Sequence, residues 1–306
     1  MEPIVQAINV SHQYGTQKSV YDLSLSLETG EVMALLGTNG AGKTTTLKLL
    51  TGELIPLTGS IKINGVDINL HPCKAKHNLG YLPDIAPLYG DLTVDEFLMF
   101  CGRIRGMSAN DARVRMGEVK SFCELKSVSR RLISKLSKGY QQRIGIAQAI
   151  IHKPVVIILD EPTNGLDPTQ MQEMRDLILH LRNQSGVLLS THQLNEVEQI
   201  CDRVHMIKSG RTVFCEKIDD LQQSNRIRVR FKSVAPVEAI EKLPEINKVI
   251  KLSDTQIEVI ADTNPDEVKS LLISNSQEED WNVIEIYDVK ETLENIFVSE
   301  VLRSHH

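Results

Sequence analysis

Eight consecutive residues match a pattern that is typical of phosphate-binding loops. They satisfy G-x-x-x-x-G-K-[ST] directly after a strand-like apolar run: Gly37, Thr38, Asn39, Gly40, Ala41, Gly42, Lys43 and Thr44. The glycines let the backbone curl so that N–H groups point at an anion, and the helix predicted to begin near Lys43 adds its positive end. Lys43 is expected to reach the β- and γ-phosphates of a nucleoside triphosphate, and the Thr44 hydroxyl to ligate Mg²⁺. Thr45 completes the predicted nucleotide site.

Phosphate chemistry also requires a carboxylate that holds the magnesium, and the segment Val155–Glu161 ends an apolar run with two acids. Asp160 is suited to positioning the metal, and Glu161 to acting as the general base that aligns the attacking water. Either acid alone could be an ordinary surface residue at the end of a strand. Their occurrence together with the phosphate loop favours the functional interpretation.

Three apolar runs must position these side chains: Glu31–Gly37, Lys153–Asp160 and Gly186–Thr191. Continuous apolar runs of this length are typical of strands that are buried on both faces of a parallel sheet. The sequence therefore predicts an α/β body.

Length and charge limit the remaining possibilities. The chain has 306 residues, which indicates a large and a smaller domain, and its hydrophobic content of 41% is that of a globular protein. Residues 1–220 carry 24 basic and 24 acidic side chains, and residues 221–306 carry 10 and 16, so the net charge of −6 lies in the last segment. A body without a basic excess makes nucleic acid a poor candidate partner. The five scattered cysteines are expected to be reduced, and neither a signal peptide nor a membrane-spanning stretch is predicted.

The rhythm of apolar residues changes twice along the chain. Between residues 94 and 150 the apolar positions fall three or four apart, which predicts a helical subdomain at about 85–150 within a first domain of residues 1–221. Residues 222–306 predict a small α+β domain with the order βαββαβα, resembling the ferredoxin-like arrangement. Its elements are expected at Arg226–Phe231, Val237–Leu243, Lys248–Leu252, Gln256–Ile260, Pro265–Ser274, Trp281–Tyr287 and Glu291–Leu302.

Further motifs in the body resemble those of ATP-binding cassette (ABC) proteins. Leu136–Arg143 resembles the cassette signature sequence, and its Ser137 lies 23 residues before Asp160. Pro162–Asp167 resembles the D-loop, and Ser190–His192 resembles the segment that ends in the switch histidine. The resemblance covers residues 1 to about 220, with the motifs in the family's order.

The resemblance implies a P-loop cassette that works as a head-to-tail dimer, with two ATP molecules between phosphate loop and signature. The signature residues Ser137, Lys138, Gly139 and Tyr140 would then face the nucleotide of a second subunit. Ser137 is predicted to cap a helix whose free N–H groups form an anion site. If the motif stood alone, Ser137 would be interpreted as the cap of an ordinary surface helix.

Two further contacts to the nucleotide follow from the resemblance. His192 would hold the γ-phosphate and the attacking water near Glu161, which its neutral ring can do by hydrogen bonding. Tyr14 takes the place of an aromatic ring that stacks on adenine, although it could equally be an aromatic residue at a strand end.

The sequence departs from the general cassette pattern at two positions. Asp84 stands where most cassettes have a glutamine that touches the metal, and its metal contact is expected to pass through water. Lys138 stands in an LSKGY signature in place of the commoner LSGGQ, beside the partner's phosphates. Both departures, and the trailing α+β domain, resemble the cassette subunits of ABC-2-type exporters.

The resemblance therefore implies the ATP-hydrolysing subunit of an ABC transporter, with ATP and Mg²⁺ as cofactors. It would act as a homodimer or with a paired cassette subunit, on the cytoplasmic face of the cell membrane, with a separate transmembrane permease. Leu88 and Tyr89 are apolar residues in a loop and are predicted to line the groove for that permease. The alternative is a soluble cassette ATPase with a regulatory or non-transport role. Only 94 positions separate Lys43 from Ser137, which leaves no room for the long coiled coils of DNA-repair relatives.

Overall fold

The chain divides into two compact units, Met1–Lys217 and Ile218–His306. The computed structural model describes residues 2–222, 226–243, 245–261, 264–279, 281–289 and 292–302. The sequence placed the boundary between its two domains after residue 221, within the short helix α8 (Ile218–Gln222).

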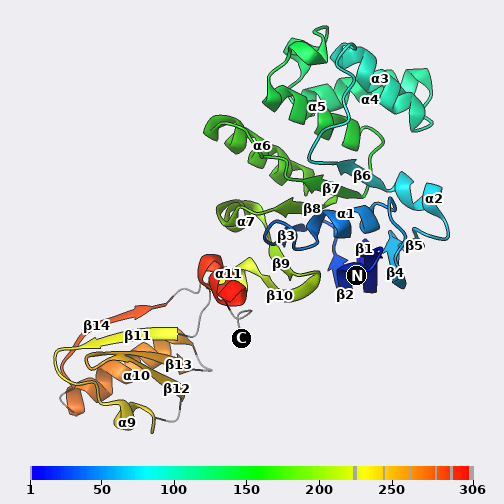
Figure 1. The fold of residues 1–306 in the computed structure, drawn as a ribbon. Helices are drawn as coiled ribbons and strands as arrows, with labels where there is room; N and C mark the ends of the chain where they lie inside the picture. Colours follow the sequence, from blue (N-terminus) through cyan, green and yellow to red (C-terminus); the bar gives the residue numbers. More distant parts are fainter. Residues whose placement is uncertain are drawn as a thin grey trace. The chain divides into compact units, whose positions relative to one another are not determined.

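A six-stranded sheet forms the centre of the first unit (Figure 1). Its strand order is β10-β9-β3-β8-β7-β6, and every neighbouring pair is parallel except β9 and β10. The bounds are β3 Val32–Leu36, β6 Leu79–Leu82, β7 Val156–Asp160, β8 Gly186–Thr191, β9 Arg203–Lys208 and β10 Arg211–Lys217. All residues of β3, β7 and β8 are buried, as their apolar runs predict. The predicted α/β fold class is confirmed.

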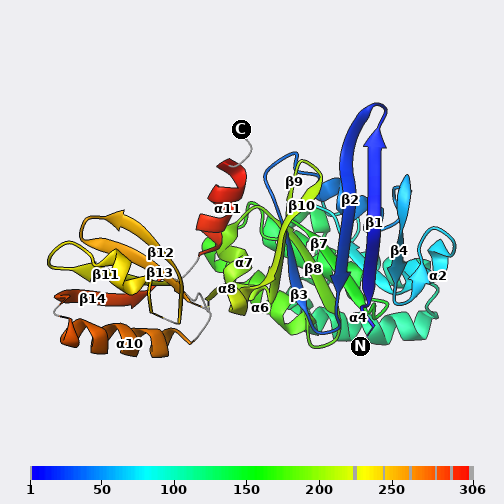
Figure 2. The same ribbon diagram turned by 90° about the horizontal axis from the view of Figure 1, so that it is seen from below.

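Helices cover both faces of this sheet because each face is apolar. Helices α6 (Pro168–Leu181) and α7 (Leu194–Ile200) lie on one side, and α1 (Lys43–Leu50) lies on the other (Figure 1). On the side of α1, a second, antiparallel sheet with the order β2-β1-β4-β5 closes the core. Its long β1–β2 pair is prominent in Figure 2. The bounds are β1 Val5–Tyr14, β2 Gln17–Leu27, β4 Thr58–Ile63 and β5 Val66–Asp67, followed by α2 (Pro72–His77).

Three helices gather beyond β6 and form the helical part of the first unit (Figure 1). They are α3 (Val94–Ile104), α4 (Ala109–Phe122) and α5 (Lys138–Ile150), with short 3₁₀ turns at Lys126–Val128 and Ile133–Lys135. Thr93 and Glu96 form a reciprocal capping box at the start of α3, and Ser108 caps α4. These local signals fix where the helical part begins.

The second unit is a four-stranded antiparallel sheet with the order β12-β13-β11-β14. Its elements are β11 Arg226–Phe231, α9 Val237–Ile240, β12 Ile246–Ser253, β13 Gln256–Ala261, α10 Pro265–Glu278, β14 Val283–Asp288 and α11 Leu293–Leu302. The order of these elements along the chain is the one predicted. Helix α9 is shorter than predicted, and Glu291, where the last helix was expected to begin, lies outside the described residues.

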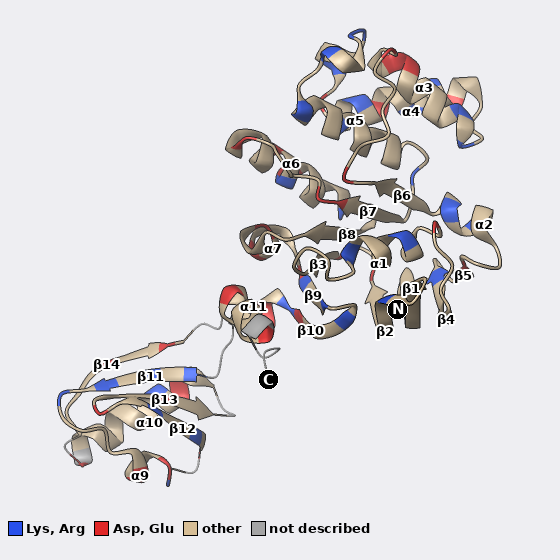
Figure 3. Cartoon of the chain, viewed as in Figure 1, with Lys and Arg blue, Asp and Glu red and all other residues tan. Residues whose placement is uncertain are grey.

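Charged residues of the second unit pair across its strands. The basic residues of β11, blue in Figure 3, meet acids on both neighbouring strands. Arg228 Nη2 donates to Glu258 Oε2 at 2.9 Å, and Arg230 Nη2 donates to Glu285 Oε1 at 2.7 Å. None of the helices in the described part of the chain combines the length and hydrophobicity that a bilayer-spanning segment requires.

Candidate nucleotide-binding site

The parallel strands bring the predicted site residues to one edge of the six-stranded sheet. Strands β3, β6, β7 and β8 run in the same direction, so the segments that follow their carboxyl ends meet there. A cavity of about 370 Å³ opens at this edge. It is lined by Ser19, Thr38, Asn39, Gly40, Gly42, Lys43, Thr44, Thr45, Asp84, Asp160, Glu161, Asn164 and His192.

The phosphate loop needs glycine at positions where a side chain would collide with backbone. Gly42 has a φ of 108°, and a Cβ there would lie 2.8 Å from the carbonyl oxygen of Ser19. A Cβ at Gly37 would lie 2.5 Å from the carbonyl oxygen of Ile207. The loop therefore passes close to its neighbours and leads directly into α1, whose first turn points into the cavity.

Lys43 is a buried cation held by its own loop. Its Nζ donates to the carbonyl oxygen of Gly37 at 2.7 Å and lies 3.9 Å from Glu161 Oε1. Burial lowers the pKa of Lys43, and the carboxylates of Glu161 and Asp160 oppose this shift. A phosphate group entering the cavity would meet a desolvated positive charge, where electrostatic attraction is strong.

Asp160 ends strand β7 and is only 5% exposed. Burial raises the pKa of Asp160, and the neighbouring carboxylates of Glu161 and Asp84 raise it further. This excess of negative charge would be relieved by a divalent cation. Among the described residues, no group of three His, Cys, Asp or Glu side chains forms a self-sufficient metal site. A magnesium ion here would therefore need phosphate oxygens as further ligands, which is its usual mode of binding.

Glu161 and His192 contact each other at the mouth of the cavity. The Nδ1 atom of His192 lies 2.9 and 3.0 Å from the two carboxylate oxygens of Glu161. Glu161 has a φ of 49°, and its backbone N–H donates to the carbonyl oxygen of Ser190 on β8 at 2.9 Å. This left-handed turn aims the carboxylate at the cavity, with a general base and a hydrogen-bonding ring side by side.

Some predicted residues lie outside this lining. Gly37 and Ala41 shape the loop from behind, where both are buried. Tyr14 ends β1, is 50% exposed and makes an edge-to-face contact with His12 at 5.0 Å. Tyr14 can therefore stack on the base of a nucleotide only if that nucleotide extends beyond this cavity.

Sequence reasoning missed two residues that line the cavity, Ser19 and Asn164. The Oγ of Ser19 lies 2.8 Å from the Oγ1 of Thr45. This contact joins β2 to the first turn of α1. Nothing in the sequence around Ser19 signals this contact. Asn164 lies within the D-loop motif, so its proximity to Glu161 could have been inferred.

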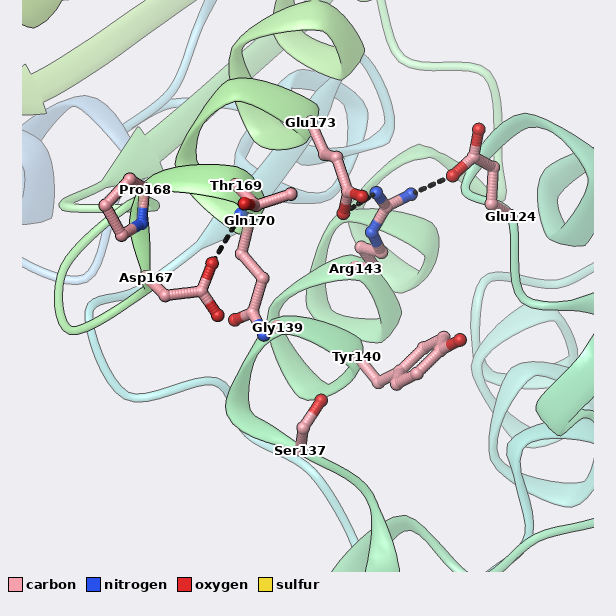
Figure 4. Close-up of a pocket in the computed structure, with 10 residues that line it drawn as sticks. All are labelled: Glu124, Ser137, Gly139, Tyr140, Arg143, Asp167, Pro168, Thr169, Gln170 and Glu173. Carbon is pink, nitrogen blue, oxygen red and sulfur yellow. Dashed lines mark hydrogen bonds and ion pairs between the residues drawn. The ribbon is translucent and has the colours of Figure 1, made fainter.

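The signature residues line a different cavity, of about 560 Å³ (Figure 4). Ser137, Gly139 and Tyr140 border it from the start of α5, and Asp167 borders it from the start of α6. Asp167 caps α6 by accepting from the backbone N–H of Gln170 at 2.9 Å. Ser137 occupies the N-cap position of α5, but within the described part of the chain its side chain accepts no capping hydrogen bond. Ser137 therefore stands at the predicted cap position without making the capping hydrogen bond, and its hydroxyl faces the cavity (Figure 4).

Arg143 holds the signature helix in place (Figure 4). Its guanidinium donates to Glu124 and to Glu173, each at 2.8 Å, and to the carbonyl oxygen of Cys123 at 3.3 Å. These contacts tie α5 to the end of α4 and to α6.

Lys138 lies apart from the other signature residues. Its Nζ reaches over Gly165 in the D-loop of the same chain. Lys138 lines a third cavity, of about 670 Å³, to which Asp84 and Asn164 also contribute. The two positions that depart from the general cassette pattern, Asp84 and Lys138, therefore border the same space within one chain.

Comparison with known proteins gives consistent matches. The family model described as "ABC transporter" matches residues 20–164. The bacitracin transport ATP-binding protein BcrA of Bacillus licheniformis is 33% identical over 85% of this chain and 81% of its own. The Nod factor export ATP-binding protein I of Burkholderia orbicola is 37% identical over 67% of this chain and 68% of its own. A solved structure of an ATP-binding subunit of an ABC transporter is 30% identical, with a TM-score of 0.65 over 72% of this chain and 92% of that one.

Proposed function

Because this chain belongs to the ABC transporter family and is one of its ATP-binding, ATP-hydrolysing subunits, we propose that two such subunits close around two ATP molecules. We propose further that this closure and the hydrolysis that reopens it drive an export permease. The observation that carries this proposal is that, within one chain, the phosphate loop and Ser137 line separate cavities.

The cavity of the phosphate loop and the cavity of Ser137, Gly139 and Tyr140 have no lining residue in common among the described residues. Ser137 and Gly139 therefore lie outside the cavity that Lys43 lines, which supports a second chain as the source of the signature residues at each nucleotide. The first turn of the 13-residue helix α5 presents backbone N–H groups and the Ser137 hydroxyl to an open cavity, which suits an anion brought by another subunit. A two-fold related pair of chains would complete two equivalent sites.

Each residue of the nucleotide cavity is proposed to have a separate role in binding or hydrolysing ATP. Lys43 neutralises the β- and γ-phosphates, and the N–H groups of the loop hold their oxygens. Glu161 accepts a proton from the attacking water, and His192 fixes the position of that carboxylate by the contact between them. Thr44 and Asp160 would hold Mg²⁺, with Asp84 reaching it through water, and the ion would supply charge stabilisation on the phosphate oxygens when bound.

Export is supported by the relatives and by the sequence motifs. One relative is named for Nod factor export and another for bacitracin transport, and Asp84 and the LSKGY signature resemble those of ABC-2-type exporters. The subunit would then be peripheral on the cytoplasmic face of the membrane, where it meets the permease.

The surface that receives the permease is proposed to lie where the segment after Asp84 meets α3. The ring of Tyr89 packs against Phe97 and Phe100, with centroids 6.0 and 5.5 Å away. Tyr89, Phe100 and Ile104 border a hollow of about 210 Å³ and are 53%, 39% and 67% exposed. Leu88 lines the neighbouring cavity that contains Lys138. Exposed aromatic and aliphatic side chains around a hollow are typical of a site for a partner's helix.

A docking experiment tests this surface. Charged substitutions at Leu88 and Tyr89 together should abolish copurification with the permease and leave nucleotide affinity unchanged. The matched control replaces Leu70, which is 74% exposed and lies away from this hollow, with a charged residue. Unchanged copurification of the double variant would refute the proposed surface.

Complementation tests the composite site. Lys43→Ala and Ser137→Arg should each abolish hydrolysis in a homodimer. Mixing the two variants restores one intact site in each heterodimer, so the mixture should recover about a quarter of wild-type activity. A mixture that stays as inactive as its components would contradict a site shared between chains.

A further inference from the structure

Glu196 is a carboxylate in an unexpected place. It lies in the first turn of α7, is 0% exposed and is outside the lining of the nucleotide cavity. Burying an ionisable carboxyl group is unfavourable unless hydrogen bonds or opposite charges compensate for the lost hydration. A buried glutamate that packs behind a nucleotide site therefore needs a structural reason.

One contact of Glu196 reaches the residue that precedes His192. The Oγ1 of Thr191 donates to Glu196 Oε2 at 2.8 Å. The same Oγ1 accepts from the backbone N–H of Gln193 at 3.1 Å. Thr191 is itself 0% exposed and ends strand β8. Its hydroxyl is thus fixed from both sides, and the backbone turn that carries His192 is fixed with it.

The segment that follows Glu161 contains a second buried threonine, Thr163. Thr163 is 1% exposed, and neither its hydroxyl nor Glu196 Oε1 makes a hydrogen bond within the described part of the chain. Burial raises the pKa of Glu196, and the hydrogen bond from the Thr191 hydroxyl and the charge of Arg175 oppose that shift. The backbone N–H of Asn164 donates to the carbonyl oxygen of Glu161 at 3.1 Å, so Thr163 lies within the turn that Glu161 begins.

We propose that Glu196 is a positioning residue that holds His192 against Glu161 by binding, from behind, the hydroxyl of Thr191, the residue that precedes His192. This inference rests on the proposed roles of Glu161 and His192 in hydrolysis. Glu196 itself touches neither nucleotide nor water. Its effect passes through Thr191, whose position sets the 2.9 Å contact between the His192 ring and the Glu161 carboxylate.

The test measures hydrolysis and nucleotide binding separately in the purified full chain. Glu196→Ala and Thr191→Val remove the two ends of the same hydrogen bond. Each should lower kcat about 10- to 100-fold, because a small misplacement of a catalytic group has effects of that size. KM and the affinity for a fluorescent ATP analogue should stay within about threefold of wild type, since the phosphate loop is untouched. The double variant should be no slower than the slower single variant, because both act through one bond.

Conservative variants and a structural control separate positioning from stability. Glu196→Gln and Thr191→Ser keep an acceptor and a hydroxyl, so both should retain kcat within about threefold. Val197→Ala, at a neighbouring residue of α7 that is also 0% exposed, should lower thermal stability and leave kcat unchanged. If Val197→Ala lowers kcat as much as Thr191→Val, the effect is general loosening of α7 and the positioning role is refuted.

The variant Glu161→Gln distinguishes the inference from the proposal on which it rests. If Glu161→Gln is inactive and both Glu196→Ala and Thr191→Val hydrolyse ATP at the wild-type rate, Glu196 has no positioning role. If Glu161→Gln itself hydrolyses ATP normally, the proposed catalytic assignment is wrong, whatever the other variants do.

Discussion

Replacing Arg143 by methionine should destabilise the first unit and leave the second unchanged. Arg143 is 8% exposed and makes the three charge-assisted hydrogen bonds that join the signature helix to α4 and α6. Methionine keeps much of the apolar stem, so the substitution removes mainly the guanidinium contacts.

The expected loss follows from the exposure of each partner. The side chains of Glu124 and Glu173 are 73% and 50% exposed, so solvent screens these pairs and each contributes about 0.3–1 kcal/mol. The bond to the carbonyl oxygen of Cys123 is buried and contributes about 1 kcal/mol. The total is about 2–3 kcal/mol, which corresponds to a fall in Tm of about 4–12 °C for a unit of this size.

The assay uses the position of the single tryptophan. Trp281 is buried in the core of the second unit, so its fluorescence reports unfolding of that unit, while far-ultraviolet circular dichroism reports both. The circular dichroism transition should shift and the Trp281 transition should not. The control variant, Arg182→Met, removes one partly exposed ion pair with Asp202, at 3.1 Å. It should lower the free energy of unfolding by less than about 1 kcal/mol. A Tm for Arg143→Met equal to that of the Arg182→Met control would refute the reasoning.

Three further predictions concern the nucleotide site. Asp160→Asn should raise the Tm without Mg²⁺ or nucleotide at pH 7: burial, Glu161 and Asp84 raise the pKa of Asp160, so its charge destabilises the folded state above that pKa. The gain should vanish as the pH falls and Asp160 becomes protonated, and a pH-independent difference in a calorimetric series would contradict it. Lys43→Met should weaken binding of a fluorescent ATP analogue about 10- to 100-fold, and an unchanged Kd would exclude the proposed phosphate contact. Tyr14→Ala should weaken ATP and GTP binding alike, by about 1–3 kcal/mol, whereas unaltered titrations would show that the ring does not stack on a base.

The parts of the fold that could be predicted from the sequence are those with local signals. The apolar runs that became β3, β7 and β8 predicted a parallel sheet, and their common direction then brought the phosphate loop, Asp160 and His192 to one edge. The alternation of elements after residue 222 predicted the order of the second unit, because short strands and helices with distinct periods leave few arrangements.

The contacts that the sequence could not predict depend on packing between distant segments. Ser19 meets Thr45 only because β2 passes beside α1, and Lys138 reaches Gly165 only because α5 starts next to the D-loop. Glu196 was overlooked because a glutamate in a short helix is usually exposed, and only the packing of α7 buries it behind the site. The start of α8 at Ile218 had no apolar pattern long enough to be recognised.

The most direct test of the account is the oligomeric state of Glu161→Gln with and without ATP. This variant keeps the shape of the site and loses the general base, so bound ATP should persist between phosphate loop and signature. Size-exclusion chromatography with light scattering should show a dimer in the presence of ATP and Mg²⁺ and a monomer without them. The double variant Glu161→Gln with Ser137→Arg should remain a monomer under both conditions. A single variant that stays monomeric with ATP and hydrolyses it at the wild-type rate would contradict a site shared between two chains.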